Sequence, residues 1–411
     1  MRSLTLLAAL LLPAVSLANG YDVPNVAARD LSLSGSAVAA QVDAGATYAM
    51  PAGLARLSGL SLSINASMLV LDTEWTAPDG SGLTPTPDSS NFAPVPPVGI
   101  FASYGFTLGG NRAGVGFGLN TPGGGNVNWD EDWAGRGRII LVDRKIYGLY
   151  LSGGYELIPQ LRLGASAIYY YATEYLKQGV QPFPDAYGEL STTGGGFAWG
   201  LSAEATPVLS VPLTLAIDYK YKGTMKLEGD GHFQVPPALA TQVQDQGLTH
   251  ELIYPAVLNV AASWRVATPV LITAGFTYTF YEDYVSDTFV GDKGMVIDVP
   301  RNYDNGQTYR LGVEWTASDK LALRAGLLRD ISGLDTATYS PTLPDASSWA
   351  GSLGAGWTFS PNISVSGAFF YAVMDKVTAT GTEAFPGSYQ TSAWILSAGL
   401  TYRRDLAGGG K

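Results

Sequence analysis

The sequence contains no cysteine, only two histidines among 411 residues, and few charges, with Asp, Glu, Lys and Arg together at 14%. The absence of cysteine excludes a disulfide framework and a thiolate metal site. Acidic residues outnumber basic ones by 35 to 24 and the net charge is −11, so no basic patch is present to neutralise nucleic-acid phosphates. The composition therefore argues against a disulfide-stapled domain and against nucleic acid as a partner.

Long apolar runs are also missing. The run at residues 4–12 is too short to span a bilayer. Arg2 before it, and the small residues Ser16 and Ala18 after it, are typical of a secretory signal that is cleaved after Ala18. We therefore predict a signal peptide over residues 1–18, with a short N-terminal anchor as the alternative. Any membrane crossing by the rest of the chain must use strands.

What the sequence does have is alternation with a period of two. In residues 213–222, Leu213, Leu215 and Ile217 alternate with smaller or polar residues. Alternate residues of a strand point to opposite faces, so each such segment separates two environments. No helical pattern remains to cover the apolar faces, and the other faces carry charges and glycines. The simplest fold is an all-β, closed antiparallel transmembrane barrel with lipid outside and a polar lumen.

Fourteen segments carry this pattern, which is an even number, as bacterial barrels require. They lie at residues 60–71, 98–108, 112–120, 146–157, 161–173, 197–206, 213–223, 252–265, 270–281, 308–316, 321–328, 349–359, 363–374 and 392–403. Short turns alternate strictly with long connections, at residues 72–97, 121–145, 174–196, 224–251, 282–307, 329–348 and 375–391. In outer-membrane barrels the short turns are periplasmic and the long loops extracellular, whereas a soluble sandwich has no reason to keep its long loops at one end.

Aromatic residues on the apolar faces lie at both ends of the strands, as interfacial belts do. At the short-turn ends they are Tyr155, Trp264, Trp315, Trp357, Phe359 and Tyr402, and at the opposite ends Tyr171, Phe280 and Tyr371. The other faces predict the lumen, with Arg162, Glu204, Asp218, Lys220, Asn259, Arg310, Glu314, Arg324 and Arg403. Charges of both signs predict paired networks in a narrow lumen rather than a wide water-filled pore.

The segment before the first strand, residues 19–57, is rich in Ala, Ser and Gly, which pack closely. It is either a periplasmic extension or a plug, and a fourteen-stranded barrel is wide enough to need a plug. We therefore divide the chain into a signal peptide (1–18), an N-terminal plug (19–57), a barrel (58–403) and a C-terminal tail (404–411).

Four segments, in order along nearly the whole mature chain, carry a family resemblance. They are residues 129–136, 299–330, 340–345, and 46–57 with Met50, Pro51, Ala52, Gly53 and Leu54. With them the chain resembles the FadL-type outer-membrane transporters of long-chain fatty acids and related hydrocarbons. The resemblance implies a fourteen-stranded barrel plugged by an N-terminal hatch, and capture of a hydrophobic ligand by extracellular loops. It also implies an internal site beside the hatch and release through a lateral opening at a kinked third strand.

Two features depart from the family. Met50 stands where the family usually has Asn, and a thioether cannot make the hydrogen bonds of an amide. Either the hatch gates differently here or another residue supplies the bond. The chain also does not end on an aromatic residue, because a polar, Gly-rich tail follows Tyr402.

The predicted third strand has Gly114, Gly116 and Gly118 on one face and Pro122 just beyond. Missing side chains leave a hole or a bend, and proline cannot complete a ladder. A lateral exit for an apolar ligand explains this pattern, and so does close packing of the plug against a bare strand. The two explanations are compatible.

Two further sets of residues are predicted to meet the ligand. In loops 174–196 and 224–251 we predict an exposed apolar surface that captures the ligand, formed by Phe183, Tyr187, Phe233, Leu239 and Leu248. The alternative is that these residues pack on one another and order the loops. In the lumen, an acid ligand requires a cation, for which the candidates are Lys220, Arg310 and Arg324. The alternative is that these cations pair with lumen carboxylates such as Asp218, Glu204 and Glu314.

Signals for other chemistry are weak. Asp79 and the acidic residues 130–132 have the oxygen ligands that Ca²⁺ prefers, but acidic loops are usually only solvated. His232 and His250 fall in one predicted loop, and nothing orders them with a serine into a triad. We therefore predict no catalytic residue, no metal and no cofactor.

Together these patterns predict an outer-membrane channel that takes up fatty acids or hydrocarbons by passive, ligand-gated diffusion. Its partners are the hydrophobic ligand, outer-membrane lipid and lipopolysaccharide, with no nucleic acid and no obligate protein partner. A diffusion porin for polar solutes, a barrel enzyme that acts on lipids, and an adhesin or structural barrel are the alternatives.

Overall fold

The computed structural model describes residues 27–83, 88–92, 95–379 and 384–405. The predicted signal peptide and residues 406–411 of the predicted tail lie outside the described residues. None of the helices in the described part of the chain is long and apolar enough to cross a bilayer.

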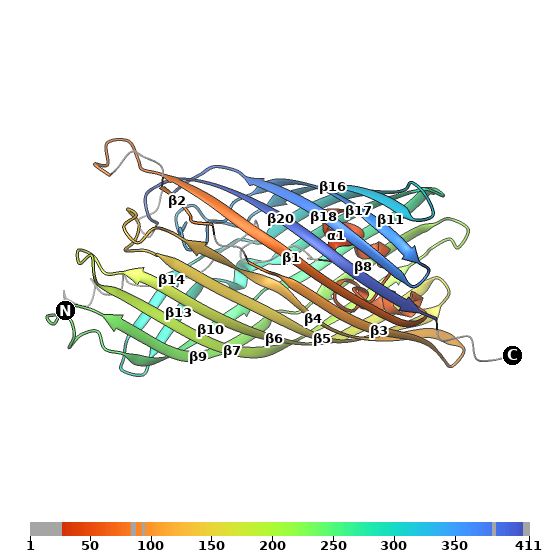
Figure 1. The fold of residues 1–411 in the computed structure, drawn as a ribbon. Coiled ribbons are helices and arrows are strands. Elements are labelled where there is room, and N and C mark those ends of the chain that lie inside the picture. The colour runs from red at the N-terminus through yellow and green to blue at the C-terminus, as the bar shows by residue number, and fades with distance from the viewer. Residues whose placement is uncertain (1–26, 84–87, 93–94, 380–383, 406–411) are drawn as a thin grey trace.

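The strands form one continuous antiparallel sheet that closes on itself (Figure 1). They are β1 (Gly59–Thr76), β2 (Asp88–Ser89), β3 (Val98–Leu108), β4 (Asn111–Asn128), β5 (Leu141–Ile158), β6 (Leu161–Gly179), β7 (Tyr187–Ala205), β8 (Leu213–Lys220), β9 (Gly223–Gln234), β10 (Gln246–Tyr254), β11 (Ala256–Ala267), β12 (Val270–Phe280), β13 (Ser286–Gly291), β14 (Val296–Pro300), β15 (Gly306–Thr316), β16 (Leu321–Ile331), β17 (Ser348–Ser360), β18 (Ile363–Met374), β19 (Val377–Ala379) and β20 (Gly387–Arg404).

The sheet is a closed barrel of fourteen strands, which confirms the predicted fold class. Some barrel strands consist of two successive elements, because β8 and β9 both pair with β7, and β11 and β10 pair with them in turn. Closure comes from β1, which pairs with β3 along one edge and with β20 along the other. Since every barrel strand has two neighbours, no open sheet edge runs the length of the wall.

The outer face of the barrel is apolar and ends in aromatic belts, as the alternation predicts. Leu353 and Phe197 project outward, with 64% and 80% of their surface exposed. Near the short turns the predicted aromatics Trp264, Trp315 and Phe359 are exposed as well. Exposed apolar residues in a band between aromatic belts are the pattern of a lipid-facing wall.

Beyond the belt at the long-loop end the alternation reverses. In β9 the apolar Met225 and Leu227 are buried inside the barrel, whereas Lys226 and Glu228 are exposed outside. The prediction that residues 224–251 form a loop is therefore wrong, since most of them belong to β9 and β10, which pair as a hairpin. The wall here extends above the apolar band, where water covers its outer face and protein fills its interior.

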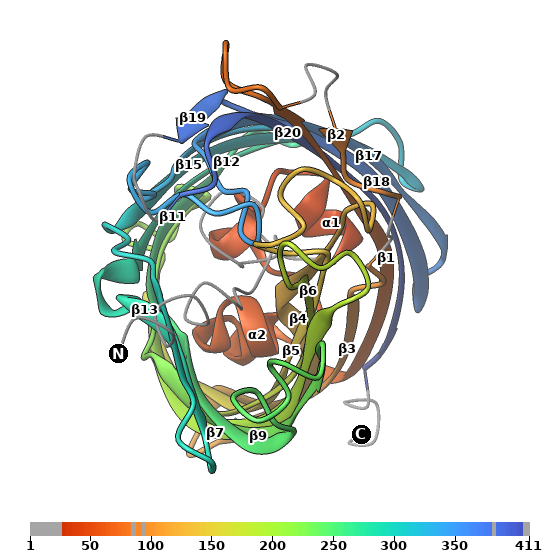
Figure 2. The same cartoon turned by 90° about the vertical axis from the view of Figure 1, so that its left-hand side faces the viewer.

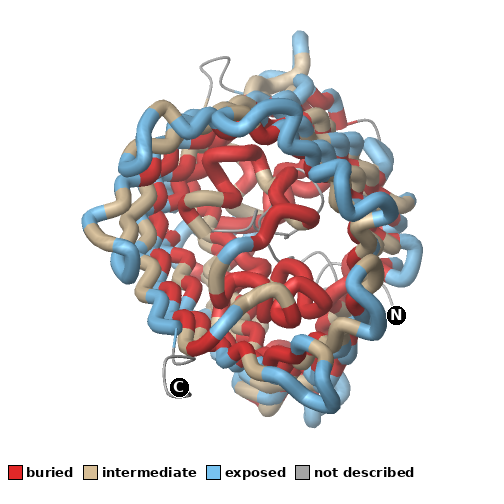
Figure 3. Tube along the Cα trace, turned by 90° about the vertical axis from the view of Figure 1, so that its right-hand side faces the viewer, coloured by how far each residue is buried: buried red, intermediate tan, exposed pale blue. Residues whose placement is uncertain are grey.

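The N-terminal segment lies inside the barrel, as Figure 2 shows. Its helices have only one or two turns: α1 (Ala28–Leu31), η1 (Ala37–Ala40), α2 (Ala46–Ala49) and η2 (Pro51–Arg56). A further short helix, η3 (Tyr281–Asp283), follows β12. Most residues of the segment are buried, which makes the centre of the barrel red in Figure 3, inside an exposed rim. Small side chains let these tight turns stack within the lumen.

Candidate functional site

Glycines on the inner wall let the N-terminal segment approach the strand backbones. A Cβ added at Gly114 would lie 2.4 Å from the carbonyl oxygen of Leu54, and one at Gly154 would lie 2.5 Å from that of Pro51. A Cβ at Gly116 would lie 2.2 Å from Oγ1 of Thr47. Gly118 differs, because the nearest atom to its Cβ position belongs to Phe101. Gly114 and Gly116 therefore serve close packing, the second of the two explanations considered for them.

Hydrogen bonds and ion pairs fix the segment in place. The backbone N–H of Ala52 donates to Oγ of Ser202 over 2.9 Å, and Oγ of Ser152 donates to the carbonyl of Thr47 over 2.7 Å. Arg56 pairs with the buried Glu204 at 3.0 Å, which in turn pairs with Arg162 on β6 at 3.1 Å. Each of these contacts joins the segment to the β5–β7 side of the wall.

Met50 occupies an apolar niche where the family usually has Asn. Its side chain is fully buried, with Ala39, Ala52, Ala216 and Ala261 in the same cluster. The niche supplies packing, and the polar contacts around it come from Ala52 and Arg56 instead. The geometry therefore favours the second explanation for Met50, in which other residues supply the hydrogen bond that the family's Asn would make.

A cavity of about 90 Å³ separates the segment from the opposite wall. We call it the lumen pocket; it is lined by Asp30, Ser34, Gly35, Val38, Tyr48, Ala49, Tyr170, Lys220, Tyr254, Val257, Asn259, Thr277 and Arg310. Three tyrosines contribute aromatic surface, and the remaining lining is mainly polar. The pocket is thus amphipathic, and of the sequence-predicted cations it contains Lys220 and Arg310.

These cations are already engaged. Nζ of Lys220 pairs with Asp218 and lies 5.1 Å from the centre of the Tyr48 ring, while Arg310 donates to Oγ1 of Thr277. Arg324 does not line this pocket, and its Nε donates to Glu314 over 2.7 Å. The three predicted cations therefore do not form one anion site, and Lys220 and Arg324 follow the pairing alternative.

Tyrosines dominate the lumen above the pocket. Tyr170 and Tyr254 have ring centres 4.9 Å apart, and they belong to a buried cluster with Tyr150, Tyr281, Tyr284, Tyr303, Met225 and Leu252. None of these tyrosines was predicted from the sequence to meet the ligand. Tyr170 lies on the inward face of the predicted strand 161–173, so the alternation of that strand could have identified it as a lumen residue.

The long-loop end of the lumen is closed by a segment between β16 and β17. Residues 339–346 are all buried, and Leu343 belongs to the tyrosine cluster. Both terminal nitrogens of Arg301 donate to Oγ1 of Thr342 over 3.3 Å, and Oγ1 of Thr338 donates to the carbonyl of Arg301 over 2.6 Å. This inserted segment, which contains the 340–345 motif, is the outer counterpart of the N-terminal segment.

Arg301 connects the inserted segment to a buried group of charges. Its guanidinium binds Oδ2 of Asp287 at 2.9 Å, and Asp287 also approaches His250 at 3.4 Å. On the other side, Nδ1 of His250 lies 3.0 Å from Glu174, which accepts from Nε of Arg144 over 2.8 Å. These five groups join β5, β6, β10 and β13 across the barrel interior.

The charge group lies beyond the apolar band, because outward-facing neighbours at this level, such as Lys226 and Glu251, are charged and exposed. Burial disfavours the charged form of His250, but the carboxylates of Glu174 and Asp287 outweigh it and raise the pKa of His250 to about 9. Burial likewise opposes ionisation of Asp287, yet Arg301 and Arg144 hold its pKa well below the usual range. The group is therefore fully ionised near neutral pH.

The residues of the predicted capture surface lie in different parts of the structure, some in connections and some in strands. Phe183 lies in the β6–β7 connection and Leu239 in the β9–β10 connection, whereas Tyr187 and Phe233 are strand residues. The prediction that Leu248 is exposed is wrong, since it lies in β10 with 2% exposure and packs in the interior. Buried Leu248 alternates with the exposed residues Thr249 and Glu251, which is the pattern of a strand.

The wall has a local discontinuity at β4. Its pairing with β5 shifts between Asn120 and Gly123, so one extra residue forms a bulge at Pro122. The ladder with β3 ends at the Gly99–Asn120 pair, and within the described residues β4 has no further ladder on that side. The hydroxyl of Tyr254 donates to the carbonyl of Pro122 over 3.1 Å. One side chain thus joins the lumen pocket to the bulge.

The remaining candidates lie in separate parts of the described structure. His232 is exposed in β9 beside Asp245, and His250 is buried in β10, so the prediction that both lie in one loop is wrong. Asp130 accepts from Asn91, and Glu131 pairs with Lys177. Across the described residues, no three His, Asp or Glu side chains gather in a way that could hold a metal ion.

Comparison with known proteins gives one family over almost the whole length. Residues 9–404 match the model of the family described as "Outer membrane protein transport protein (OMPP1/FadL/TodX)". No curated protein sequence matches the chain.

Several solved structures share the fold at low sequence identity. A Pseudomonas aeruginosa FadL homologue is 17% identical, with a TM-score of 0.82 over 93% of this chain and 99% of its own. The Pseudomonas putida toluene transporter TodX is 14% identical, with a TM-score of 0.71 over 94% and 99% of the two chains. The Ralstonia pickettii toluene transporter TbuX is 14% identical, with a TM-score of 0.68 over 92% and 99%.

Proposed function

Because the chain belongs to the outer membrane protein transport family (OMPP1/FadL/TodX), we propose that it takes up hydrophobic small molecules, fatty acids or hydrocarbons, by passive diffusion through the outer membrane. The similar solved channels include two that are described as toluene transporters and one as a monoaromatic hydrocarbon channel. Their descriptions support an apolar substrate class for this chain.

The observation that carries the proposal is the tyrosine-walled lumen between two inserted segments. Tyr170 and Tyr254 offer aromatic surface, while residues 28–56 close one end and residues 339–346 close the other. An apolar ligand gains free energy when it leaves water for such a site. Entry requires the outer segment to move, so uptake is gated by the ligand.

Release through the wall is the second part of the proposal. The β4 bulge lies where the ladder with β3 ends, next to the lumen pocket, and the residues after it are Gly123, Gly124 and Gly125. Glycines present no side chain to obstruct a ligand. A hydrophobic molecule that leaves here enters the bilayer core, whereas an exit to the periplasm would return it to water. We propose that the apolar band of the barrel contacts outer-membrane lipid and lipopolysaccharide.

The alternatives find less support. A porin for polar solutes needs an open lumen, and here both ends carry buried inserts. A barrel enzyme needs a nucleophile next to its base, but the ring nitrogens of His250 face Glu174 and Asp287. We therefore propose that the chain is not an enzyme.

Deletion of Pro122 tests the route. The deletion removes the extra residue, so β4 can pair regularly with β5. We expect uptake of radiolabelled oleate and toluene by cells that express the variant to fall about tenfold or more, which corresponds to a barrier higher by about 1.4 kcal/mol. Pro122→Ala keeps the bulge length and serves as the control. Unchanged uptake in the folded deletion variant would refute lateral release, and absent uptake in the unaltered protein would refute the function itself.

A further inference from the structure

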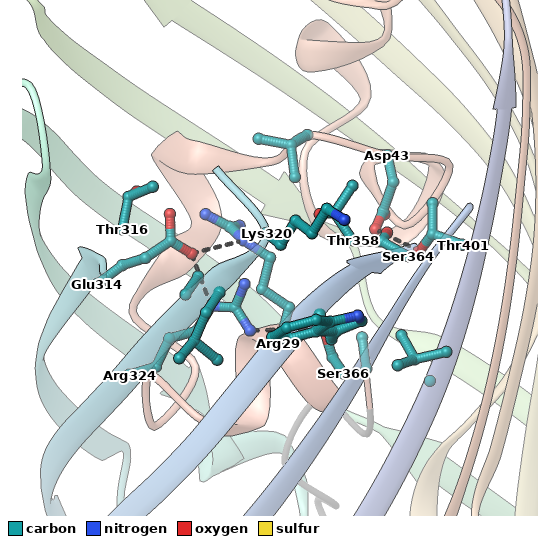
Figure 4. Close-up of a pocket in the computed structure, with 18 of the residues that line it drawn as sticks. Arg29, Asp43, Glu314, Thr316, Lys320, Arg324, Thr358, Ser364, Ser366 and Thr401 are labelled. Atoms are coloured by element: carbon teal, nitrogen blue, oxygen red, sulfur yellow. Dashed lines mark hydrogen bonds and ion pairs between the residues drawn. The ribbon is translucent and has the colours of Figure 1, made fainter. Parts of the chain in front are cut away.

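A second, larger cavity lies at the short-turn end of the barrel, which faces the periplasm in an outer-membrane protein. It has a volume of about 240 Å³ and separates the N-terminal segment from β15–β18, β20 and β1 (Figure 4). We call it the vestibule. Its wall carries charges and hydroxyls, among them Arg29, Glu314, Arg324, Thr358, Ser366 and Thr401. This lining contrasts with the tyrosines of the lumen.

The charges that line the vestibule balance, with four acidic and four basic residues, so they present a hydrophilic surface without a net demand for a counter-ion. Glu314 accepts from Nε of Arg29 at 3.1 Å and from Nε of Arg324 at 2.7 Å. Thr401 donates to Asp43 over 3.2 Å. Paired charges and hydroxyls hydrogen-bond well to water and to small polar solutes, whereas an apolar ligand would gain nothing by displacing that water.

Asp30 separates the two cavities. Among the residues that the structure describes, it is the one that lines both the lumen pocket and the vestibule. Its side chain is buried at the end of α1, where Nε2 of Gln41 donates to Oδ2 over 2.9 Å. Gln41 also donates to the carbonyl of Ala37 over 3.0 Å. The partition is therefore the carboxylate of Asp30, which the amide of Gln41 and the guanidinium of Arg29, 4.0 Å away, help to hold.

The N-terminal segment packs closely against both sides of the wall. Toward β4–β6 it touches bare glycine backbone, with no room for even a Cβ at Gly114 or Gly154. Toward β15–β17 it packs as closely, since a Cβ at Gly326 would meet the backbone of Leu33, and the vestibule lies on the short-turn side of this contact. The part that can open is therefore the side chain of Asp30, with the segment held in place.

We propose that the barrel contains a second passage, hydrophilic and directed to the periplasm, that Asp30 closes and that takes water and small polar solutes. The passage adds a route to the proposed uptake of hydrophobic molecules and does not depend on it. The two exits sort their cargo by polarity: apolar molecules leave through the β4 bulge, and polar ones pass Asp30.

The absence of cysteine in the natural chain allows a direct test. Val257 lines only the lumen pocket and Thr358 only the vestibule, so Val257→Cys and Thr358→Cys report on the two cavities separately. Each is made in the full chain with Asp30, Asp30→Ala, Asp30→Asn or Asp43→Ala. The purified proteins are treated with a small cationic methanethiosulfonate, and the rate of labelling is followed by mass spectrometry.

We expect Val257→Cys to react about tenfold or more faster with Asp30→Ala than with Asp30 or Asp30→Asn, because alanine removes the partition and asparagine keeps its size. Asp43→Ala, which changes only the vestibule, should leave that rate unchanged, and Thr358→Cys should react fast in every background. Equal rates with Asp30 and Asp30→Ala overturn the proposal, and so does fast labelling of Val257→Cys when Asp30 is intact.

If Asp30→Ala fails to fold, Gln41→Ala takes its place, since it removes the amide that donates to the carboxylate and leaves Asp30 itself in place. An increased Val257→Cys rate then supports the passage, and an unchanged rate overturns it. Uptake of radiolabelled oleate, measured on the same variants, shows separately whether the hydrophobic route operates, so the two proposals fail independently.

Discussion

The hydroxyl of Tyr254 donates a hydrogen bond to the carbonyl oxygen of Pro122 over 3.1 Å, across 132 residues of sequence. The ring of Tyr254 lines the lumen pocket, and Pro122 lies in the β4 bulge. A ligand that displaces this ring therefore acts on the bulge through one bond. This contact offers a physical link between occupancy of the pocket and release through the wall.

Tyr254→Phe should speed release. The variant keeps the ring but loses a buried hydrogen bond, whose contribution of about 1 kcal/mol corresponds to a roughly fivefold change in rate. We expect hydrophobe uptake to rise by up to that factor, with a small loss of thermal stability. Tyr303→Phe is the matched control, because its hydroxyl has no hydrogen-bond partner within the described residues. A decrease in uptake that is specific to Tyr254→Phe would show that the bond assists release instead.

Gly114→Ala should displace the N-terminal segment. The added Cβ would lie 2.4 Å from the Leu54 carbonyl, and overpacking of this kind costs about 1–3 kcal/mol. We expect a lower unfolding temperature and a higher frequency of open events in planar-bilayer conductance recordings. Gly153→Ala is the control, since the nearest atom to its Cβ position is 3.9 Å away. The packing argument fails if the two alanine variants behave alike.

Met50→Asn, which restores the usual family residue, should destabilise this chain. The amide would be buried among Ala39, Ala52, Ala216 and Ala261, and a buried amide without a hydrogen-bond partner costs about 1–3 kcal/mol in proteins. Met50→Leu keeps the volume and should cost less than about 1.5 kcal/mol. Chemical denaturation of both variants measures the difference. Equal or greater stability of Met50→Asn would reveal a polar partner near the niche.

Alkaline pH should loosen the outer end of the barrel. The folded-state pKa of His250 is raised from 6.5 to about 9, so its contribution to stability is fully present below pH 6.5 and is lost as the pH rises through about 9. We expect the unfolding temperature to fall over that window. His250→Gln should flatten the profile in this range, whereas His232→Gln, at an exposed pair, should preserve it. A profile that is the same in all three proteins would exclude His250 as its origin.

The strands within the apolar band could be predicted closely from the sequence. The predicted segment 98–108 coincides with β3, and 363–374 coincides with β18. Their outward residues face lipid, so the apolar residues point outward and the polar residues inward, as expected for a membrane barrel. The family motifs could likewise be read directly, because they are local strings.

The strands beyond the band were missed for a physical reason. In β9 and β10 the apolar residues face inward and the charged residues outward, as in a soluble protein. A search for lipid-facing strands therefore takes them for loops, although Met225 and Leu227 alternate clearly with Lys226 and Glu228. The same reversal explains why His250 was placed in a loop and why Leu248 was taken as exposed.

The sequence by itself determined the barrel and its strand number, because period-two alternation and turn length are properties of short segments. Only the tertiary structure decided what occupies the interior. It brought Arg301 to Asp287 and His250, set Tyr254 against Pro122, and placed Asp30 between two cavities. These contacts depend on strand register and on the stagger of a closed wall, which join residues far apart in the chain and leave no local pattern.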